Sequence, residues 1–271
     1  MADGERHVLL DVREDGVAVI TLNRPAQRNA YSRSLGVQLQ EAVRECERRE
    51  DVRSMVLTGA GRAFCAGVDL VEFSKGSRGV DPRARGDRPL PDVKSLRAGW
   101  LGHRTKLLIG AVNGPAVTGG LELALNCDFL IASPQASFAD THARVGIMPG
   151  WGLTVLLPQF VGVARARQMS VTGDYVPAAT ALAWGLVNEV VPQEELLPRA
   201  CALAGTAAKI KAPAVEHLLA TYAATTGGTV EAGLLTEQEF KRRYAESDRG
   251  EVGKRYADIR TRGAAQQTSK L

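Results

Sequence analysis

The chain has 271 residues, enough for one α/β core or for a core with a helical appendage. Hydrophobic residues make up 45% and charged residues 24%, values typical of a globular protein, and no apolar run is long enough to span a membrane. A net charge of +4, with 34 basic and 30 acidic residues interspersed, disfavours nucleic-acid binding and suits an anionic small ligand.

The N-terminal segment "HVLLDVREDGVAVITLNRP" predicts a β-hairpin. Two runs of β-forming residues, Val8–Val12 and Val17–Leu22, flank an acidic turn that ends at Gly16, and Pro25 stops the second strand. The segment "SRSLGVQLQEAVRECERRED" predicts an amphipathic helix, because its apolar residues recur at helical spacing and Ser32 is a suitable N-cap.

Three short apolar runs farther along the chain predict buried strands. They are "RSMVLTGAG", "LLIGAVNG" and "CDFLIAS", and they alternate with helical stretches. This alternation is typical of βαβ units and indicates an α/β fold with a mainly parallel sheet. Residues 74–92 are rich in Gly, Pro and Arg and predict a surface loop. This loop is solvent-exposed padding, a lid over a site, or a basic flap that faces a phosphate.

The pattern changes near residue 194. The segments "EELLPRACALAGTAAKI", "APAVEHLLATYAAT" and "EAGLLTEQEFKRRYAES" predict helices, with no convincing strand among them. We therefore predict a core at residues 1–193 and a C-terminal helical region at residues 194–271. Such a region either covers its own core or packs on a neighbouring subunit.

Two loops share the order strand, glycine turn, helix: "VLTGAGRAFCAGVDLVEF" and "GAVNGPAVTGGLELALNCDF". Each presents unpaired backbone N–H groups at a helix N-terminus, where the helix dipole favours negative charge. If both turns are aimed at one oxygen, they form an oxyanion hole worth roughly 3–4 kcal/mol to a transition state. Neither loop matches a dinucleotide or P-loop motif, and the histidines are too scattered for a metal site.

Glu122 follows the second glycine turn and has apolar neighbours in "LELALNC". A carboxylate in such surroundings is partnered, compensates a helix N-terminus, or is functional. The residues alone leave charge compensation and catalysis both open.

The cysteines and the two chain ends bear on the cellular compartment. Cys46, Cys65, Cys127 and Cys201 form no CxxC pair and no zinc pattern, which favours a reducing compartment. The opening "MADGERHVLLDV" lacks a signal peptide's apolar stretch, and the chain ends in Ser-Lys-Leu. We expect a cytoplasmic protein, with the peroxisome as the alternative if the source is eukaryotic.

These blocks together resemble the enoyl-CoA hydratase/isomerase (crotonase) superfamily. The similarity runs from about residue 8 to 191 and rests on "ITLNRPAQRNAYS", "VLTGAGRAFCAGVDL", "AVNGPAVTGGLELALNCDFLIAS", "VGIMPGWGLTVLLPQFVG" and "TGDYVPAATALAWGLVNEVV". It implies a crotonase-like spiral of ββα units, followed by helices that serve oligomerisation and cover the active site. It also implies a homotrimer or dimer of trimers, an acyl-CoA substrate, no membrane or nucleic-acid partner, no metal, and no cofactor beyond the coenzyme A of the substrate.

The resemblance also implies functional residues. Glu122 matches a catalytic glutamate, and the N–H groups of Val68 and Gly119 match the oxyanion hole that holds the thioester oxygen. The implied substrate-binding residues are Arg28, Ala30, Ala66, Asp69, Leu70, Gly120 and Gly150.

One position departs from the family pattern. A hydratase of this family has a second glutamate at the end of a motif like F-G-x-P-E, whereas here the fourth residue after Phe138 is His142. An imidazole also exchanges protons near neutral pH; a neighbouring carboxylate would raise its pKa and burial would lower it. His142 is therefore a substitute acid/base of a hydratase, a ligand for the acyl group in another crotonase-type reaction (isomerase, hydrolase or decarboxylase), or a structural replacement in a weakly active acyl-CoA-binding protein.

Two neighbours of His142 leave alternatives open as well. Asp140 would point away from the site in a regular strand, but in an irregular turn it is able to orient His142. Trp151 interrupts a glycine-rich run that is common in the family. Its ring either packs in the core or shapes the acyl end of the site.

Overall fold

The computed structural model describes residues 5–69, 72, 101–102, 104–226, 228–229 and 232–239. Leu70, the loop predicted at residues 74–92 and the terminal Ser-Lys-Leu lie outside these residues. The chain divides into two compact units, Met1–Ala212 and Pro213–Leu271, and every described element of the candidate site belongs to the first.

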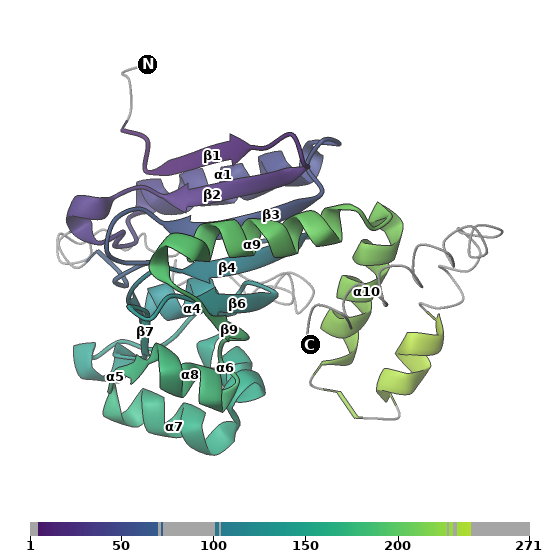
Figure 1. Cartoon of the computed structure of the whole chain (residues 1–271). Coiled ribbons are helices and arrows are strands. Elements are labelled where there is room, and N and C mark those ends of the chain that lie inside the picture. Colours follow the sequence, from purple (N-terminus) through teal and green to yellow (C-terminus); the bar gives the residue numbers. More distant parts are fainter. Residues whose placement is uncertain are drawn as a thin grey trace, which may run out of the picture. The chain divides into compact units, whose positions relative to one another are not determined.

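The first unit is built on a main sheet with the strand order β1-β2-β3-β4-β6-β9 (Figure 1). The hairpin has the predicted bounds, and β1 runs antiparallel to β2, whereas all later neighbours in this sheet pair in parallel. The three predicted buried strands are β3, β4 and β6. The bounds are β1 (Val8–Val12), β2 (Val17–Leu22), β3 (Ser54–Gly59), β4 (Leu107–Val112), β6 (Phe129–Ala132) and β9 (Glu189–Val190).

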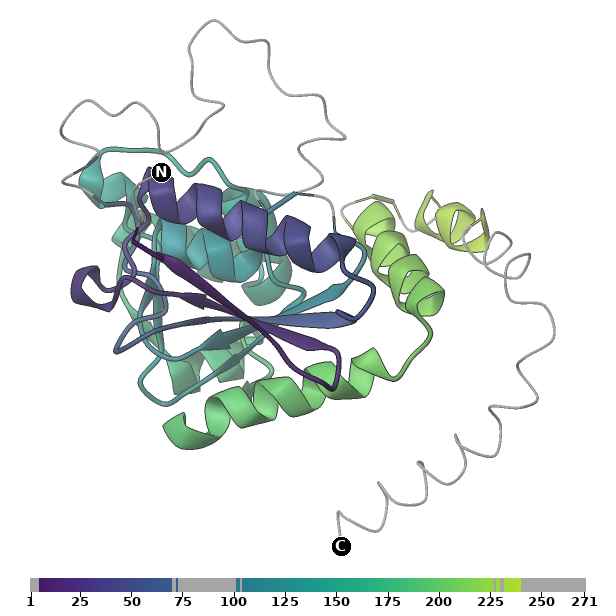
Figure 2. The same cartoon turned by 90° about the horizontal axis from the view of Figure 1, so that it is seen from above.

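Helices cover both faces of this sheet, α1 (Arg33–Arg48) on one side and α9 (Gln193–Ala208) on the other (Figure 2). Val17 and Val19 of β2 pack in the cluster that contains buried residues of α9, while the alternate residues Ala18 and Ile20 belong to the cluster on the α1 side. A parallel sheet that is buried on both faces explains why its strands are apolar nearly throughout.

The first helix forms as its sequence predicts. The Ser32 hydroxyl accepts a hydrogen bond from the Leu35 N–H at 3.2 Å, which caps the helix. Leu35, Leu39, Val43 and Cys46 are buried on the face that meets the sheet.

A second, small sheet positions the candidate site. It consists of β5 (Ala116–Val117), β7 (Ser137–Ala139) and β8 (Val176–Pro177), with β5 and β7 parallel. Because parallel strands end at the same edge, the helices that follow them, α4 (Gly119–Leu125) and α5 (His142–Val145), begin side by side. The Thr118 N–H donates to the Ala139 carbonyl at 2.8 Å and fixes this arrangement.

The other described elements of the first unit are η1 (Pro25–Gln27), α6 (Leu153–Val161), α7 (Val163–Thr172) and α8 (Ala178–Trp184). Buried residues of α9 pack against the main sheet within the first unit, which runs to Ala212. The division at residue 193 and the roles of the helices after it stay predictions. Helix α10 (Ala212–Thr225) begins at the last residue of the first unit and continues into the second, where residues 232–239 are also helical. Among the helices that the structure describes, none has the length and apolar character needed to cross a bilayer.

Candidate active site

The two glycine turns predicted from the sequence pack directly against each other. Cys65 pairs with the segment before α4: its N–H donates to the Pro115 carbonyl at 3.1 Å, and its carbonyl accepts from the Val117 N–H at 3.0 Å. A Cβ atom on Gly120 would collide with the Cys65 carbonyl, and one on Gly67, whose φ is +99°, would lie 3.0 Å from the Val117 carbonyl oxygen. The turns approach this closely because both positions lack side chains.

This contact brings the predicted oxyanion-hole residues together. The Gly67 carbonyl accepts from the Tyr31 N–H at 2.7 Å, so the Val68 N–H at the other end of that trans peptide points away from Tyr31. Gly119 is the first residue of α4, where an N–H has no acceptor within the helix. A Cβ on Gly119 would lie 3.6 Å from Cγ2 of Val68. Among the described residues, neither N–H has a hydrogen-bond acceptor.

Glu122 lies on the first turn of α4 and is only 2% exposed. Its Oε1 atom accepts two backbone hydrogen bonds, from the Trp151 N–H at 2.7 Å and the Gly150 N–H at 3.1 Å. The Asn126 side chain fastens the two segments together, because its Nδ2 donates to the carbonyls of Glu122 (2.8 Å) and Trp151 (3.1 Å). Two N–H donors replace the water that burial removes from the carboxylate, and Oε2 is left to face the rest of the site.

His142 begins α5 and is 3% exposed. Its Nδ1 atom lies 2.6 Å from Oδ1 of Asp140, and the same carboxylate oxygen accepts the His142 backbone N–H at 3.2 Å. On the opposite side of the ring, Nε2 lies 3.5 Å from Oε2 of Glu122. The imidazole is therefore held between two buried carboxylates, and Asp140 points toward it, as an irregular turn allows.

The charge of His142 follows from these neighbours. Burial lowers its pKa, but the hydrogen bonds with Asp140 and Glu122 raise it more strongly, and the resulting pKa is about 9. For Asp140 the two effects have the opposite signs. Burial raises the pKa of this carboxyl, but the hydrogen bonds from His142 and Ser170 bring it below its ordinary value. Of the two opposing effects foreseen from the sequence, the carboxylates prevail, and His142 is positively charged at neutral pH.

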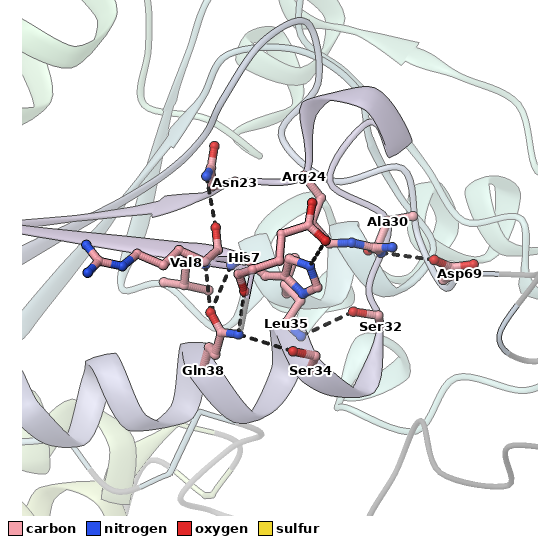
Figure 3. Close-up of polar contacts among 12 residues, drawn as sticks. His7, Val8, Asn23, Arg24, Ala30, Ser32, Ser34, Leu35, Gln38 and Asp69 are labelled. Carbon is pink, nitrogen blue, oxygen red and sulfur yellow. Dashed lines mark hydrogen bonds and ion pairs between the residues drawn. The ribbon is translucent and has the colours of Figure 1, made fainter. Parts of the chain in front are cut away.

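The segments predicted to bind the substrate also lie together. The Ala66 N–H donates to the Arg28 carbonyl at 3.0 Å. The Arg24 guanidinium contacts both segments, with Nη1 at 2.6 Å from the Ala30 carbonyl and 2.9 Å from the Asp69 carboxylate (Figure 3). Arg24 is thus a structural residue of this region that the sequence did not single out. Leu70, predicted with the same group, lies outside the described residues.

Two other predicted substrate-binding residues contact the protein itself. Gly120 provides the close approach to Cys65, and the Gly150 N–H donates to Glu122. Their predicted contacts with a substrate stay predictions.

Trp151 connects several parts of the site. Its ring centroid lies 4.6 Å from that of Tyr31 at an interplanar angle of 59°, and a Cβ on Gly119 would lie 3.0 Å from the indole ring. With 7% of its surface exposed, the side chain packs in the core, which was one of its two predicted roles. Its ring also borders the turn that presents the Gly119 N–H.

The cluster offers acid–base chemistry beside two N–H donors. Glu122 supplies a carboxylate, His142 a charged imidazole, and the two turns supply hydrogen-bond donors for an oxygen that gains negative charge. In the part of the chain that the structure describes, no group of three or more His, Cys, Asp or Glu side chains is arranged to hold a metal ion.

Comparison with known proteins gives consistent matches. The family model described as Enoyl-CoA hydratase/isomerase matches residues 12–261. Over 194 residues the chain is 41% identical to an Arabidopsis thaliana protein named "Probable enoyl-CoA hydratase 1, peroxisomal", an alignment that covers 71% of this chain and 70% of the relative. Over 198 residues it is 38% identical to the 1,2-epoxyphenylacetyl-CoA isomerase of Escherichia coli (strain K12), covering 70% and 72%.

Solved structures agree with these sequence matches. The crystal structure of enoyl-CoA hydratase from Mycobacterium tuberculosis H37Rv superposes with a TM-score of 0.71 at 44% identity, covering 87% of this chain and 99% of that one. The enoyl-CoA hydratase of Bacillus anthracis gives a TM-score of 0.77 at 32% identity, covering 87% and 90%.

Proposed function

The chain belongs to the enoyl-CoA hydratase/isomerase family and has its crotonase-like α/β fold, and on that premise we propose that it hydrates 2-enoyl-CoA thioesters. The observation that carries the proposal is the 3.5 Å approach of Nε2 of His142 to Oε2 of Glu122 beside the two glycine turns. This pair has the groups needed to take one proton from water and deliver one to carbon. The reaction makes the protein a carbon–oxygen lyase.

The chemistry follows from where charge develops. Water adds to Cβ of the enoyl group, and the electrons of the double bond move toward the thioester oxygen. We assign the N–H groups of Val68 and Gly119 to this oxygen, because preformed donors stabilise an enolate without reorganisation. Glu122 and His142 carry the proton transfers, and no cofactor is required beyond the coenzyme A of the substrate.

We assign the coenzyme A moiety to the paired segments around Arg28 and Ala66. This assignment is supported by Arg24, which holds Ala30 and Asp69 in fixed positions, so that the backbone there is preformed.

The direct test is turnover of 2-enoyl-CoA substrates of several chain lengths, followed by loss of the ultraviolet absorbance of the conjugated thioester. We expect hydration by the wild-type chain and formation of the 3-hydroxyacyl-CoA product, checked by mass spectrometry. If the protein binds acyl-CoA but hydrates no 2-enoyl-CoA of any length, the proposal is wrong, and the acyl-CoA-binding alternative takes its place.

A second candidate function is isomerisation of an acyl-CoA in the same site. It is favoured by the similarity to the E. coli isomerase and by the replacement of the expected second glutamate by His142. Product analysis separates the two reactions, because isomerisation leaves the mass of the thioester unchanged whereas hydration adds the mass of water.

We further propose that the chain assembles as a homotrimer or a dimer of trimers. The support is the set of exposed aliphatic side chains on α6, α7 and α8: Val155, Val163, Val171 and Leu182. Light scattering of the purified protein tests the assembly, and a monomer would contradict it.

We also propose a cytoplasmic location, with the peroxisome as the alternative. A fluorescent fusion with and without Ser-Lys-Leu distinguishes the two locations in a eukaryotic cell.

A further inference from the structure

The hydrogen bonds of His142 determine which of its nitrogens carries a proton toward the reacting groups. An ionised carboxylate only accepts hydrogen bonds, so Nδ1, at 2.6 Å from Asp140, carries a hydrogen in both the neutral and the charged ring. The nitrogen that faces Glu122 is then always Nε2, and it holds a proton only when the ring is charged. The hydrogen bond to Asp140 therefore fixes the orientation of the ring, and in that orientation Nε2 presents a proton to Glu122 only when the ring is charged.

The charged groups around the ring favour the protonated form. Asp140 and Glu122 are the charged groups with the largest effect on the pKa of His142, and Ser170 of α7 adds a hydrogen bond to Asp140. The nearest cation in sequence on the same helix, Arg144, instead pairs with Asp174 at 3.1 Å. A neutral ring would leave two buried carboxylates with no counter-charge, which is unfavourable away from water.

Glu122 supplies the carboxylate of the pair. Both backbone donors bind its Oε1 atom, and Oε2 is the oxygen nearest to Nε2 of His142. The resting site therefore has a carboxylate that is ready to accept a proton next to an imidazolium that is ready to donate one.

We propose that Asp140 is a positioning residue that keeps His142 as the protonated acid, so that His142 protonates Cα while Glu122 is the base that activates water. This assignment rests on the proposed hydration and divides its two proton transfers between the two residues. Asp140 itself touches neither the substrate nor the reacting atoms in this scheme.

Every proton is accounted for over one catalytic cycle of hydration. Oε2 of Glu122 takes a proton from water as the water oxygen bonds to Cβ, and the π electrons move through Cα to the thioester oxygen. The resulting enolate collapses as Cα takes the proton from Nε2 of His142. The proton on Glu122 then returns to Nε2 across the 3.5 Å gap, and the site is restored with one water added.

The test uses Asp140→Asn, which keeps an acceptor oxygen for Nδ1 but removes the charge. We expect kcat for a 2-enoyl-CoA to fall about tenfold or more near pH 7.5, with the affinity for a saturated acyl-CoA unchanged. The alkaline limb of the kcat–pH profile, expected near the His142 pKa of about 9, should move down by about one unit or more. Asp140→Glu, which retains the charge, should restore part of that shift.

A second readout does not depend on turnover. The chain has only four histidines, so the His142 signals in a ¹⁵N-histidine NMR titration can be assigned by comparison with His142→Ala. We expect His142 to titrate well above its ordinary value of 6.5 in the wild type and closer to it in Asp140→Asn. The matched control is Asp174→Asn, which removes an exposed carboxylate partner from Arg144 on the same helix and should leave both profiles unchanged.

The outcomes are separable. If Asp140→Asn leaves the NMR titration and the pH profile where they were, the role given to Asp140 is wrong even if the enzyme hydrates its substrate. If the wild type shows the raised titration but no hydration, the proposed function fails while the link between Asp140 and His142 stands.

Discussion

The two sides of the candidate site are built in different ways. On the α4 side, backbone atoms hold Glu122, since two N–H groups bind its Oε1 atom and the turn before it is packed on the Cys65 carbonyl. On the α5 side, a side chain holds His142, since Asp140 binds both its ring and its N–H. The first side allows few residue types. A Cβ at the glycine turn would collide with the Cys65 carbonyl, and a side chain without a carboxylate at position 122 would lose the two N–H partners. The second side allows a different acid at position 142 as long as the residue at position 140 can hold it by a hydrogen bond.

The most damaging change should be on the α4 side, at Glu122→Gln. The amide keeps the size of the side chain but cannot act as a base, so we expect kcat to fall by about a hundredfold or more. Steady-state kinetics on a 2-enoyl-CoA measures this, with Glu189→Gln as a surface control that loses only an exposed pair with Arg199. A loss of less than threefold or so would remove Glu122 from the proton transfers.

Changes at His142 should be the next largest. His142→Ala removes the proposed acid, and we expect kcat to fall by about tenfold to a hundredfold with little effect on acyl-CoA affinity. His142→Glu creates the residue type expected by the family pattern, yet it places a third buried carboxylate beside Asp140 and Glu122. We therefore expect little recovery from His142→Glu alone and more from the double variant Asp140→Asn, His142→Glu.

These variants also test whether His142 takes part in the chemistry, which is the first of the three roles that the sequence left open for it. An unchanged kcat in His142→Ala would place the residue outside the chemistry. If kcat recovers equally in His142→Glu and in the double variant, the negative charge of Asp140 does not determine which residue functions at position 142.

A smaller effect is expected at the turn that joins the two sides. In Gly119→Ala the new methyl group would lie 3.0 Å from the Trp151 ring, so either the ring or the Gly119 N–H has to shift by a few tenths of an ångström. We expect kcat to fall by about tenfold, since displaced oxyanion donors are costly. Gly205→Ala in α9, whose Cβ would lie 3.8 Å from the nearest side-chain atoms of Asp15 and Val17, is the control and should leave kcat unchanged. Equal kinetics for both variants would argue against an oxyanion role for this turn.

The smallest effect should appear in stability as a function of pH. The folded state raises the pKa of His142, so it favours the charged ring, and this contribution is complete below the ordinary value of 6.5. It is lost as pH rises through about 9. We expect the denaturant midpoint of the wild type to fall over this range more steeply than that of His142→Ala. Parallel curves for the two proteins would show that the pairing of His142 contributes nothing to folding.

Much of the scaffold could be predicted because local patterns determine it. The hairpin strands follow from alternating β-forming residues around a glycine turn, and α1 follows from its apolar spacing and from Ser32. The strands β5 and β7 were not predicted, because two or three residues are too few to show a period. Yet these short strands are what align α4 with α5.

The candidate site could be predicted in its residue types but not in its contacts. Glu122 stood out as a carboxylate among apolar neighbours, and His142 as a departure at a position where an acid was expected. The two N–H donors of Glu122 come from residues 28 and 29 positions later in the chain, so only the tertiary fold reveals them. The bond between Asp140 and His142 depends on the bend between β7 and α5, which residue spacing does not determine.

The imidazole between two carboxylates has a consequence for how such a site evolves. A pair of glutamates with one proton between them carries one negative charge, and the set of Glu122, charged His142 and Asp140 also sums to one negative charge. The exchange of a glutamate for a histidine that stays charged therefore keeps the net charge of the site only when a carboxylate is gained as well, which here is Asp140. We expect residues 140 and 142 to have changed together along this lineage: relatives with histidine at the second position should carry an acid at the first, and relatives with glutamate should not.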